Sequence, residues 1–159
     1  MADDLGAVAQ LLEATLDPRQ QKQGLRSLCH IRGLEFVVDF QCTGETALRQ
    51  QENKPGFSLV LLHLTASNNY PYNTRLASAL FFKNFIKRNW TDEDGNYKLP
   101  ENEVVTIKQE LISLMISMPP AIQTQLGEAV SVIADSDFWE RWDTLVDVGD
   151  GLDLSSRWF

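Results

Sequence analysis

The chain has 159 residues, of which 43% are hydrophobic and 23% charged, and its formal net charge is −8. This length suits one domain with its own core, and the composition excludes a disordered or membrane-embedded chain. Two cysteines are too few for a disulfide framework, and the acidic start Met1-Ala2-Asp3-Asp4 argues against a signal peptide. We therefore expect a soluble intracellular protein.

The charge is unevenly distributed along the chain. Residues 1–90 carry ten Lys and Arg against eight Asp and Glu, whereas residues 91–159 carry four against fourteen. An acidic surface repels phosphate backbones, which argues against a nucleic-acid ligand, and it attracts basic protein surfaces. An acidic surface also keeps a protein soluble without serving any partner. Charge alone leaves these two interpretations open.

Apolar residues recur at helical spacing through most of the chain. Leu5, Val8, Leu12 and Leu16 form one stripe, and Asp17-Pro18 ends that helix. The clearest later stripe, over 101–118, runs until Pro119-Pro120 stops it. Other stripes, separated by short polar or Pro-containing breaks such as Asp135-Ser136-Asp137, predict helices over 57–67, 73–90, 122–133 and 138–148.

Helices joined by short breaks favour antiparallel hairpins. The expected pairs are 45–67, 72–118 and 120–148, which are spaced near the ~40–47 residues of HEAT and armadillo repeats. A four-helix bundle would use the same patterns, but each segment carries a partial second stripe, as stacking between two neighbours requires. We predict an all-α fold: a HEAT-repeat α-solenoid of about three helical hairpins over 45–148, preceded by an N-terminal helix within 1–23.

The segment 24–44 breaks this pattern. It contains the strand-prone run Phe36-Val37-Val38-Asp39-Phe40, both cysteines and one of the two histidines. Its removal would join two polar, helix-favouring runs, so its local preference conflicts with its surroundings. We predict a disordered insert that arose as translated intron, and a frayed tail over 149–159. The alternative is a genuine lineage-specific loop that contacts a partner.

The acidic loop 92–103 partly matches the pattern of a calcium-binding loop. Counted from Asp92, oxygen ligands occupy positions 1, 3, 5 and 12 of a calcium-binding loop. Position 6 needs a sharp turn and is normally Gly, but here it is Tyr97. The competing interpretation is an Asp-Gly turn whose acidic residues cap the following helix, and we favour that turn.

No other residues carry a catalytic or metal-binding pattern. Cys29, His30 and Cys42 lack a fourth zinc ligand, and His63 lies on the flank of an apolar helix. The carboxylates of 135–140 are explained by helix capping. Because there is no Gly-rich phosphate loop and no histidine beside a nucleophile, we expect no enzyme activity, no cofactor and no metal.

Three separated motifs over residues 45–146 carry a family resemblance. They are ALRQQENKPGF at 47–57, TRLASALFFKNFIKRNW at 74–90, and the pair ISLMISMP and IADSDFWERWDTLV further on. In this order they resemble the importin-β N-terminal domain, and within that superfamily the importin-α re-exporters. Trp139 stands where the family has Pro, and the family continues for many more repeats beyond Phe159, so we expect a truncated N-terminal part.

The resemblance implies an arched solenoid that binds the small GTPase Ran in its GTP form through its N-terminal repeats. It also implies importin-α as cargo, contact with Phe-Gly nucleoporins, shuttling between nucleus and cytoplasm, and no catalytic residue. Lys83, Asn84 and Trp90 of the motif are interpreted as packing and helix-end residues. The competing hypotheses are a helical-repeat scaffold with an unrelated partner and a calcium-regulated helical protein.

The face that would bind a partner can be chosen from the hairpins. If the second helix of each pair lines the concave surface, then the polar face opposite each apolar stripe is the candidate. On 101–118 and 138–148 that face contains Gln109, Glu110, Ser113, Ser117, Glu140, Asp143 and Asp147. These residues suit a basic partner, and they equally suit an ordinary solvated helix face.

Overall fold

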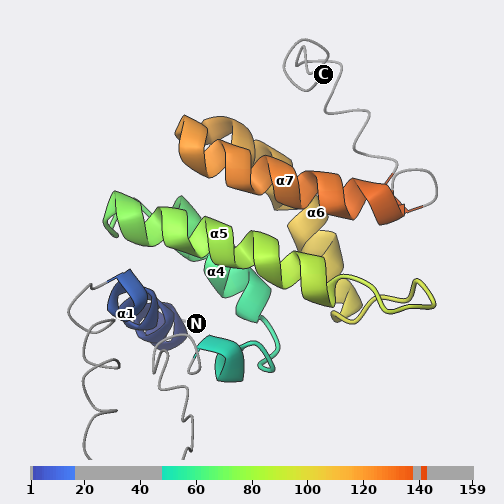
Figure 1. Cartoon of the computed structure of the whole chain (residues 1–159), viewed down its shortest axis with the longest axis horizontal. Helices are drawn as coiled ribbons and strands as arrows, with labels where there is room; N and C mark the ends of the chain where they lie inside the picture. The colour runs from blue at the N-terminus through green and yellow to red at the C-terminus, as the bar shows by residue number, and fades with distance from the viewer. Residues whose placement is uncertain (1, 17–47, 138–140, 143–159) are drawn as a thin grey trace, which may run out of the picture. The chain divides into compact units, whose positions relative to one another are not determined.

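The structure is a computed structural model that describes residues 2–16, 48–137 and 141–142. Its named helices are α1 (Ala2–Leu16), α4 (Phe57–Ala66), α5 (Tyr72–Asn89), α6 (Glu101–Ser117) and α7 (Pro120–Asp137) (Figure 1). The described residues contain no strand, only an isolated bridge between Thr91 and Tyr97. The all-α prediction is confirmed. The segment 24–44, most of 138–148 and the tail 149–159 lie outside the described residues.

The chain divides into two compact units, Met1–Ser78 and Ala79–Phe159, and the division falls within α5. In the first unit α1 packs against α4. The predicted stripe of α1 is confirmed at Val8 and Leu12, which are buried together with Leu61 and Leu64 of α4. Burial of each such side chain contributes about 1.5–3 kcal/mol. The first unit is therefore held chiefly by apolar contact.

Side chains from the first half of α5 bind the backbone of α4 and the loop after it. Ser78 Oγ donates to the Leu61 carbonyl at 2.9 Å, and Arg75 Nε donates to the Thr65 carbonyl at 2.9 Å. Arg75 also donates to Asn68 Oδ1 at 2.9 Å. The last carbonyls of a helix lack partners within it. The bond from Arg75 supplies such a partner to the Thr65 carbonyl, and together with the bond from Ser78 it holds the first half of α5 against α4.

In the second unit α6 packs against α7 (Figure 1). Met118 has the extended conformation expected of a residue before proline, and Pro120 is the first residue of α7, where its missing N–H costs nothing. The predicted stripe of α6 is confirmed, because its core side chains are buried with those of α7: Val104, Ile107, Leu111, Met115, Ile122, Leu126, Ala129 and Ile133.

Two predictions about this unit are wrong. The break at 135–137 does not exist, because α7 continues to Asp137. The expected pairs 72–118 and 120–148 are also offset by one helix, since α6 and α7 form one hairpin across a break of two residues. An apolar stripe shows that a helix has a buried face, but it does not identify the neighbour. As a consequence, α6 is the first helix of its hairpin rather than the second.

Candidate functional site

The most elaborate polar site among the described residues surrounds Asp137, whose side chain is fully buried at the end of α7. Its Oδ2 accepts hydrogen bonds from Trp90 Nε1 at 3.2 Å and from the Tyr97 hydroxyl at 2.8 Å. The ammonium of Lys108 on α6 lies 2.8 Å from the same oxygen. The site thus joins the end of α7, the middle of α6 and the loop between α5 and α6.

The other carboxylate oxygen of Asp137 faces its own chain neighbours. Oδ1 accepts from Ser136 Oγ at 2.9 Å and lies 3.5 Å from Arg141 Nε. The Arg141 guanidinium also donates to the Gly95 carbonyl at 2.9 Å and stacks 4.8 Å from the centre of the Tyr97 ring. Residue 141 is therefore fixed to the loop 91–97.

Lys108 sits among three aromatic rings. Its Nζ lies 5.3 Å from the centre of the Tyr97 ring and 5.9 Å from those of Trp90 and Trp142, distances at which a cation is attracted to a ring face. Besides binding Asp137, Nζ donates to the Tyr97 hydroxyl at 3.0 Å and to the Arg141 carbonyl at 2.8 Å. These three contacts match the three protons of an ammonium.

This arrangement stabilises a charge rather than preparing a reaction. Burial tends to raise the pKa of the Asp137 carboxyl, but the hydrogen bonds from Lys108, Tyr97 and Ser136 outweigh burial, so that pKa lies below its ordinary value. The carboxylate remains ionised at neutral pH with its oxygens occupied. The helix over 138–148 that Asp137 was predicted to cap lies outside the described residues, so capping stays a prediction, and the contacts with Trp90, Tyr97 and Lys108 were not foreseen. Trp90, interpreted from sequence as a packing residue, is 2% exposed.

The acidic loop between α5 and α6 is a tight turn. The Asp92 carboxylate accepts hydrogen bonds from the backbone N–H groups of Asp94 at 3.0 Å and Asn96 at 2.8 Å. These bonds, chiefly the one from Asn96, lower the pKa of the Asp92 carboxyl. Gly95 has φ of 82°, a conformation that glycine adopts without strain. The Asp-Gly turn predicted from sequence is confirmed, but the predicted capping is not, because the N-cap of α6 is Pro100 and no side chain makes a capping hydrogen bond there. The Asp92 carboxylate binds the N–H groups of its own loop, which favours the turn over a calcium site.

Two further properties of the described residues concern metals and membranes. Among them, no three His, Cys, Asp or Glu side chains lie close enough together to hold a metal ion; Cys29, His30 and Cys42 lie outside the described ranges. Of the helices that the structure describes, none combines the length and the hydropathy that crossing a membrane requires.

The predicted partner-binding residues are placed in part. Gln109, Glu110, Ser113 and Ser117 share the exposed face of α6, whereas Glu140, Asp143 and Asp147 lie outside the described residues. They were selected on the assumption that α6 is the second helix of a hairpin. Because it is the first, the same reasoning now selects α5 and α7. That the four α6 residues contact a partner stays a prediction.

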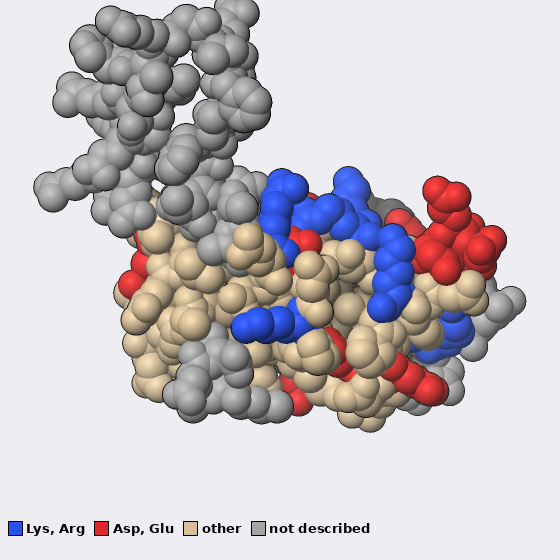
Figure 2. All heavy atoms as spheres, turned by 90° about the horizontal axis from the view of Figure 1, so that it is seen from below, with Lys and Arg blue, Asp and Glu red and all other residues tan. Residues whose placement is uncertain are grey.

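A basic surface on α5 was missed by the sequence analysis. The helix carries Arg75, Lys83, Lys87 and Arg88 and no acidic residue. Lys83 is engaged by α7, since its Nζ lies 3.0 Å from Glu128 Oε2 and 2.8 Å from Gln125 Oε1. Lys87 and Arg88 are exposed, and exposed Lys and Arg side chains are drawn in blue in Figure 2. Charge counted helix by helix, rather than over 1–90, would have revealed this surface.

Comparison with known proteins identifies the family. Residues 44–117 match the model of the importin-beta N-terminal domain. The importin alpha re-exporter of Saccharomyces cerevisiae is 58% identical over 115 residues, which make up 72% of this chain and 12% of that protein. Residues 44–117 belong to the importin-β N-terminal domain family. The resemblance predicted from the three sequence motifs is confirmed.

Other relatives extend this importin-β N-terminal domain assignment. Exportin-2 of Homo sapiens is 36% identical over 103 residues, 64% of this chain and 10% of that protein. A solved structure titled "The exportin Cse1 in its cargo-free, cytoplasmic state" is 46% identical and has a TM-score of 0.73, over 91% of this chain and 14% of that one. This likeness confirms the HEAT-repeat fold. The chain spans about a tenth of the length of the curated relatives it matches.

Proposed function

We propose that this importin-β N-terminal domain is the N-terminal part of a nuclear export receptor, that it binds Ran-GTP, and that it takes part in returning importin-α to the cytoplasm. The observation that carries the proposal is the 58% identity to an importin alpha re-exporter. The proposal includes shuttling between nucleus and cytoplasm, contact with Phe-Gly nucleoporins, and action by binding without catalysis. Nucleotide dependence would arise because the two forms of Ran differ in their affinity for the domain.

The exposed basic turn at the end of α5 is our preferred contact for Ran. Lys87 and Arg88 are exposed on the second helix of a hairpin, and long-range attraction between opposite charges speeds protein encounter. The acidic and polar face of α6 with Gln109, Glu110, Ser113 and Ser117, together with Glu140, Asp143 and Asp147, is the second candidate contact. It fits a basic partner surface.

The proposal is tested by binding of the full chain to Ran loaded with a non-hydrolysable GTP analogue, against Ran loaded with GDP. We expect weak, salt-sensitive binding of the GTP form, because one patch of a larger arch lacks the avidity of the whole and exposed charges are screened by salt. Equal affinity for both nucleotide forms would contradict the proposal and favour a helical-repeat scaffold with an unrelated partner.

Charge reversals separate the two candidate contacts. If α5 is the contact, Lys87→Glu should weaken Ran-GTP binding. If the acidic face is the contact, the triple variant Glu110→Lys, Asp143→Lys and Asp147→Lys should weaken it instead. Arg49→Glu is a matched control, since Arg49 is exposed in the first unit and the substitution changes net charge equally. An equal loss in Lys87→Glu and Arg49→Glu would show that only net charge matters.

A further inference from the structure

The last turn of α5 is closed by the loop that follows it. The backbone N–H of Trp90 donates to the Ile86 carbonyl at 3.0 Å, which extends the helical hydrogen-bond pattern by one residue. Lys98, on the returning side of the loop, donates from Nζ to the Arg88 carbonyl and from its backbone N–H to the Trp90 carbonyl, each at 3.1 Å. The last carbonyls of a helix lack donors within it, so these bonds determine how firmly the end of α5 is held.

The same loop is fixed to the buried carboxylate of Asp137 at both of its ends. Trp90, where the loop begins, and Tyr97, near its far end, both donate to Asp137 Oδ2. The two rings also meet edge to face, with their centres 5.6 Å apart. Because Tyr97 adjoins Lys98 in the chain, a continuous series of contacts leads from Asp137 to the last turn of α5.

Exposed cations project from the backbone that these contacts hold. Lys87, Arg88 and Lys98 are exposed, whereas Trp90 is 2% exposed and the Asp137 side chain is fully buried. Neither of the two buried side chains can touch a partner that binds the three cations. They can influence such a partner only by holding the backbone from which the cations project.

We propose that Trp90, Tyr97 and Asp137 are positioning residues for a partner contact at the end of α5. They hold the backbone of its last turn in the arrangement in which Lys87 and Arg88 meet an acidic surface of the partner. Ordering a surface beforehand raises affinity, because binding then loses less conformational freedom. The inference rests on the proposed function, with α5 as the contact for Ran, and it adds the residues that determine the strength of that contact.

Tyr97→Phe tests the inference with a minimal change, because it removes one hydroxyl that bonds to Asp137 and keeps the ring and the net charge. We expect the full chain to bind Ran, loaded with a non-hydrolysable GTP analogue, about two- to tenfold more weakly, as the ordering of one further side chain on binding predicts. Trp90→Phe, which removes the other donor to the same oxygen, should weaken binding similarly.

Tyr72→Phe is the matched control for the lost hydroxyl. Tyr72 is 45% exposed at the start of the same helix, far along the chain from the loop, and its substitution should leave Ran-GTP affinity unchanged. Circular dichroism at the assay temperature checks that each variant is folded.

A double-mutant cycle separates positioning from a general loss of stability. In a chain that carries Arg88→Gln, part of the proposed contact is already absent, so Tyr97→Phe should cause a smaller loss of affinity than in the parent. A variant that merely unfolds part of the population would lower the affinity by the same factor in both backgrounds. An equal loss in both backgrounds would therefore overturn the inference.

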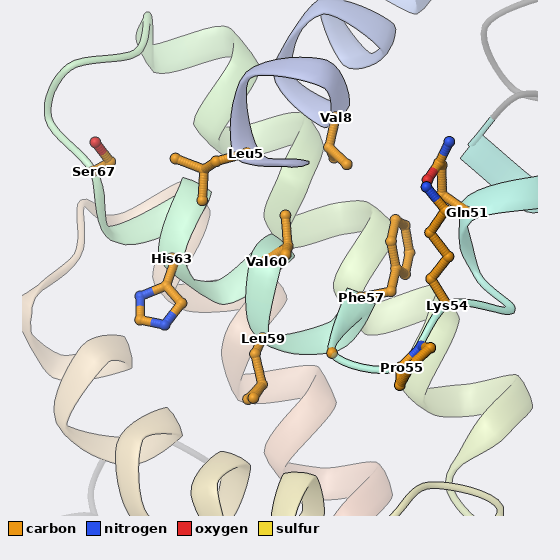
Figure 3. Close-up of a pocket in the computed structure, with 11 residues that line it drawn as sticks. Leu5, Val8, Gln51, Lys54, Pro55, Phe57, Leu59, Val60, His63 and Ser67 are labelled. Carbon is orange, nitrogen blue, oxygen red and sulfur yellow. The ribbon is translucent and has the colours of Figure 1, made fainter. Parts of the chain in front are cut away.

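Hydrogen exchange of the free chain tests the positioning without Ran. Backbone amides of residues 86–90 should exchange about two- to tenfold faster in Tyr97→Phe than in the parent, because local opening of this turn becomes easier. The reference is α4, which lines a hollow with α1 in the first unit (Figure 3) and shares no residue with the series from Asp137 to α5. Its amides should exchange at the parent rate.

The outcomes of these measurements are distinguishable. Unchanged exchange at 86–90 would overturn the inference, and so would unchanged Ran-GTP affinity in both Tyr97→Phe and Trp90→Phe. If the parent binds neither nucleotide form of Ran, the proposed function is contradicted. Exchange then decides by itself whether Asp137 and its partners hold the end of α5, so the two proposals can fail separately.

Discussion

The two units of the chain are stabilised in different ways. In the first, α1 and α4 meet through side chains such as Leu12 and Leu61, and polar groups of α5 bind backbone carbonyls of α4. In the second, an equally apolar α6–α7 core is joined to a fully buried carboxylate that a lysine and an arginine neutralise. The first unit depends on filled volume, whereas the second depends on charge pairing as well.

The unfolding of the two units can be measured separately, because the tryptophans lie in only one of them. All four tryptophans, at positions 90, 139, 142 and 158, belong to Ala79–Phe159. Tryptophan fluorescence therefore follows the second unit alone, while far-ultraviolet circular dichroism follows the helices of both. A substitution that affects one unit should move one of these signals more than the other.

The largest expected effect is that of a charge in the apolar core of the second unit. Leu111 is fully buried on α6, and an unpaired carboxylate there costs several kcal/mol. Leu111→Asp should abolish the native tryptophan fluorescence of the second unit at 25 °C. Ser113→Asp, on the exposed face of the same helix, is the control and should change little. Near-native thermal unfolding of Leu111→Asp would show that this stripe is not core.

Removing the buried carboxylate should cost somewhat less. Asp137→Ala leaves the Lys108 ammonium, whose side chain is 10% exposed, without its counter-charge, and breaking a buried pair in this way costs about 3–5 kcal/mol. Urea unfolding followed by tryptophan fluorescence measures the loss. The exposed Asp135→Ala is the control, expected within about 0.5 kcal/mol of the parent. Equal effects of the two substitutions would contradict a special role for Asp137.

Creating a new cavity in the apolar core of the first unit should lower the free energy of unfolding by a comparable amount, and this cost should not depend on charge. Leu61 is fully buried on α4, and Leu→Ala substitutions at such sites cost about 2–5 kcal/mol. The circular-dichroism signal of Leu61→Ala should be lost at lower urea concentration, with the cost unchanged between pH 7 and pH 3, a range that includes the pH at which the Asp137 contribution declines. If this cost varied with pH as strongly as that of Asp137→Ala, the contrast between the units would fail.

Acid should produce the smallest effect, and it should act on the second unit. Because the pKa of Asp137 is lowered in the folded chain, its stabilisation is fully present above the ordinary Asp pKa of about 3.9 and is lost as the pH falls through the lowered value. The difference in unfolding free energy between the parent and Asp137→Asn should therefore be constant from pH 7 to about pH 5 and shrink below pH 4. A constant difference down to pH 2 would contradict the lowered pKa.

The sequence predicted helices well where an apolar stripe meets a proline. The predicted helix 101–118 corresponds to α6 within one residue because Pro100 and Pro119 bound it. It predicted the end of α7 poorly, since Ser136 and Asp137 belong to no stripe. The Asp137 partners Trp90, Tyr97 and Lys108 are 29 to 47 residues away along the chain, a separation that only the fold closes. For the same reason, the choice of hairpin partner could not be made from periodicity.

The position of Lys108 has a consequence for covalent chemistry. Acylating reagents attack exposed amines, and an added acyl group would remove the charge and break contacts that Nζ makes with Asp137, Tyr97 and the Arg141 carbonyl. Exposed lysines such as Lys87 should react first, whereas Lys108 should become reactive only when the second unit opens. The rate at which Lys108 is acylated would then report how often the second unit opens, and it would do so in the unmodified sequence.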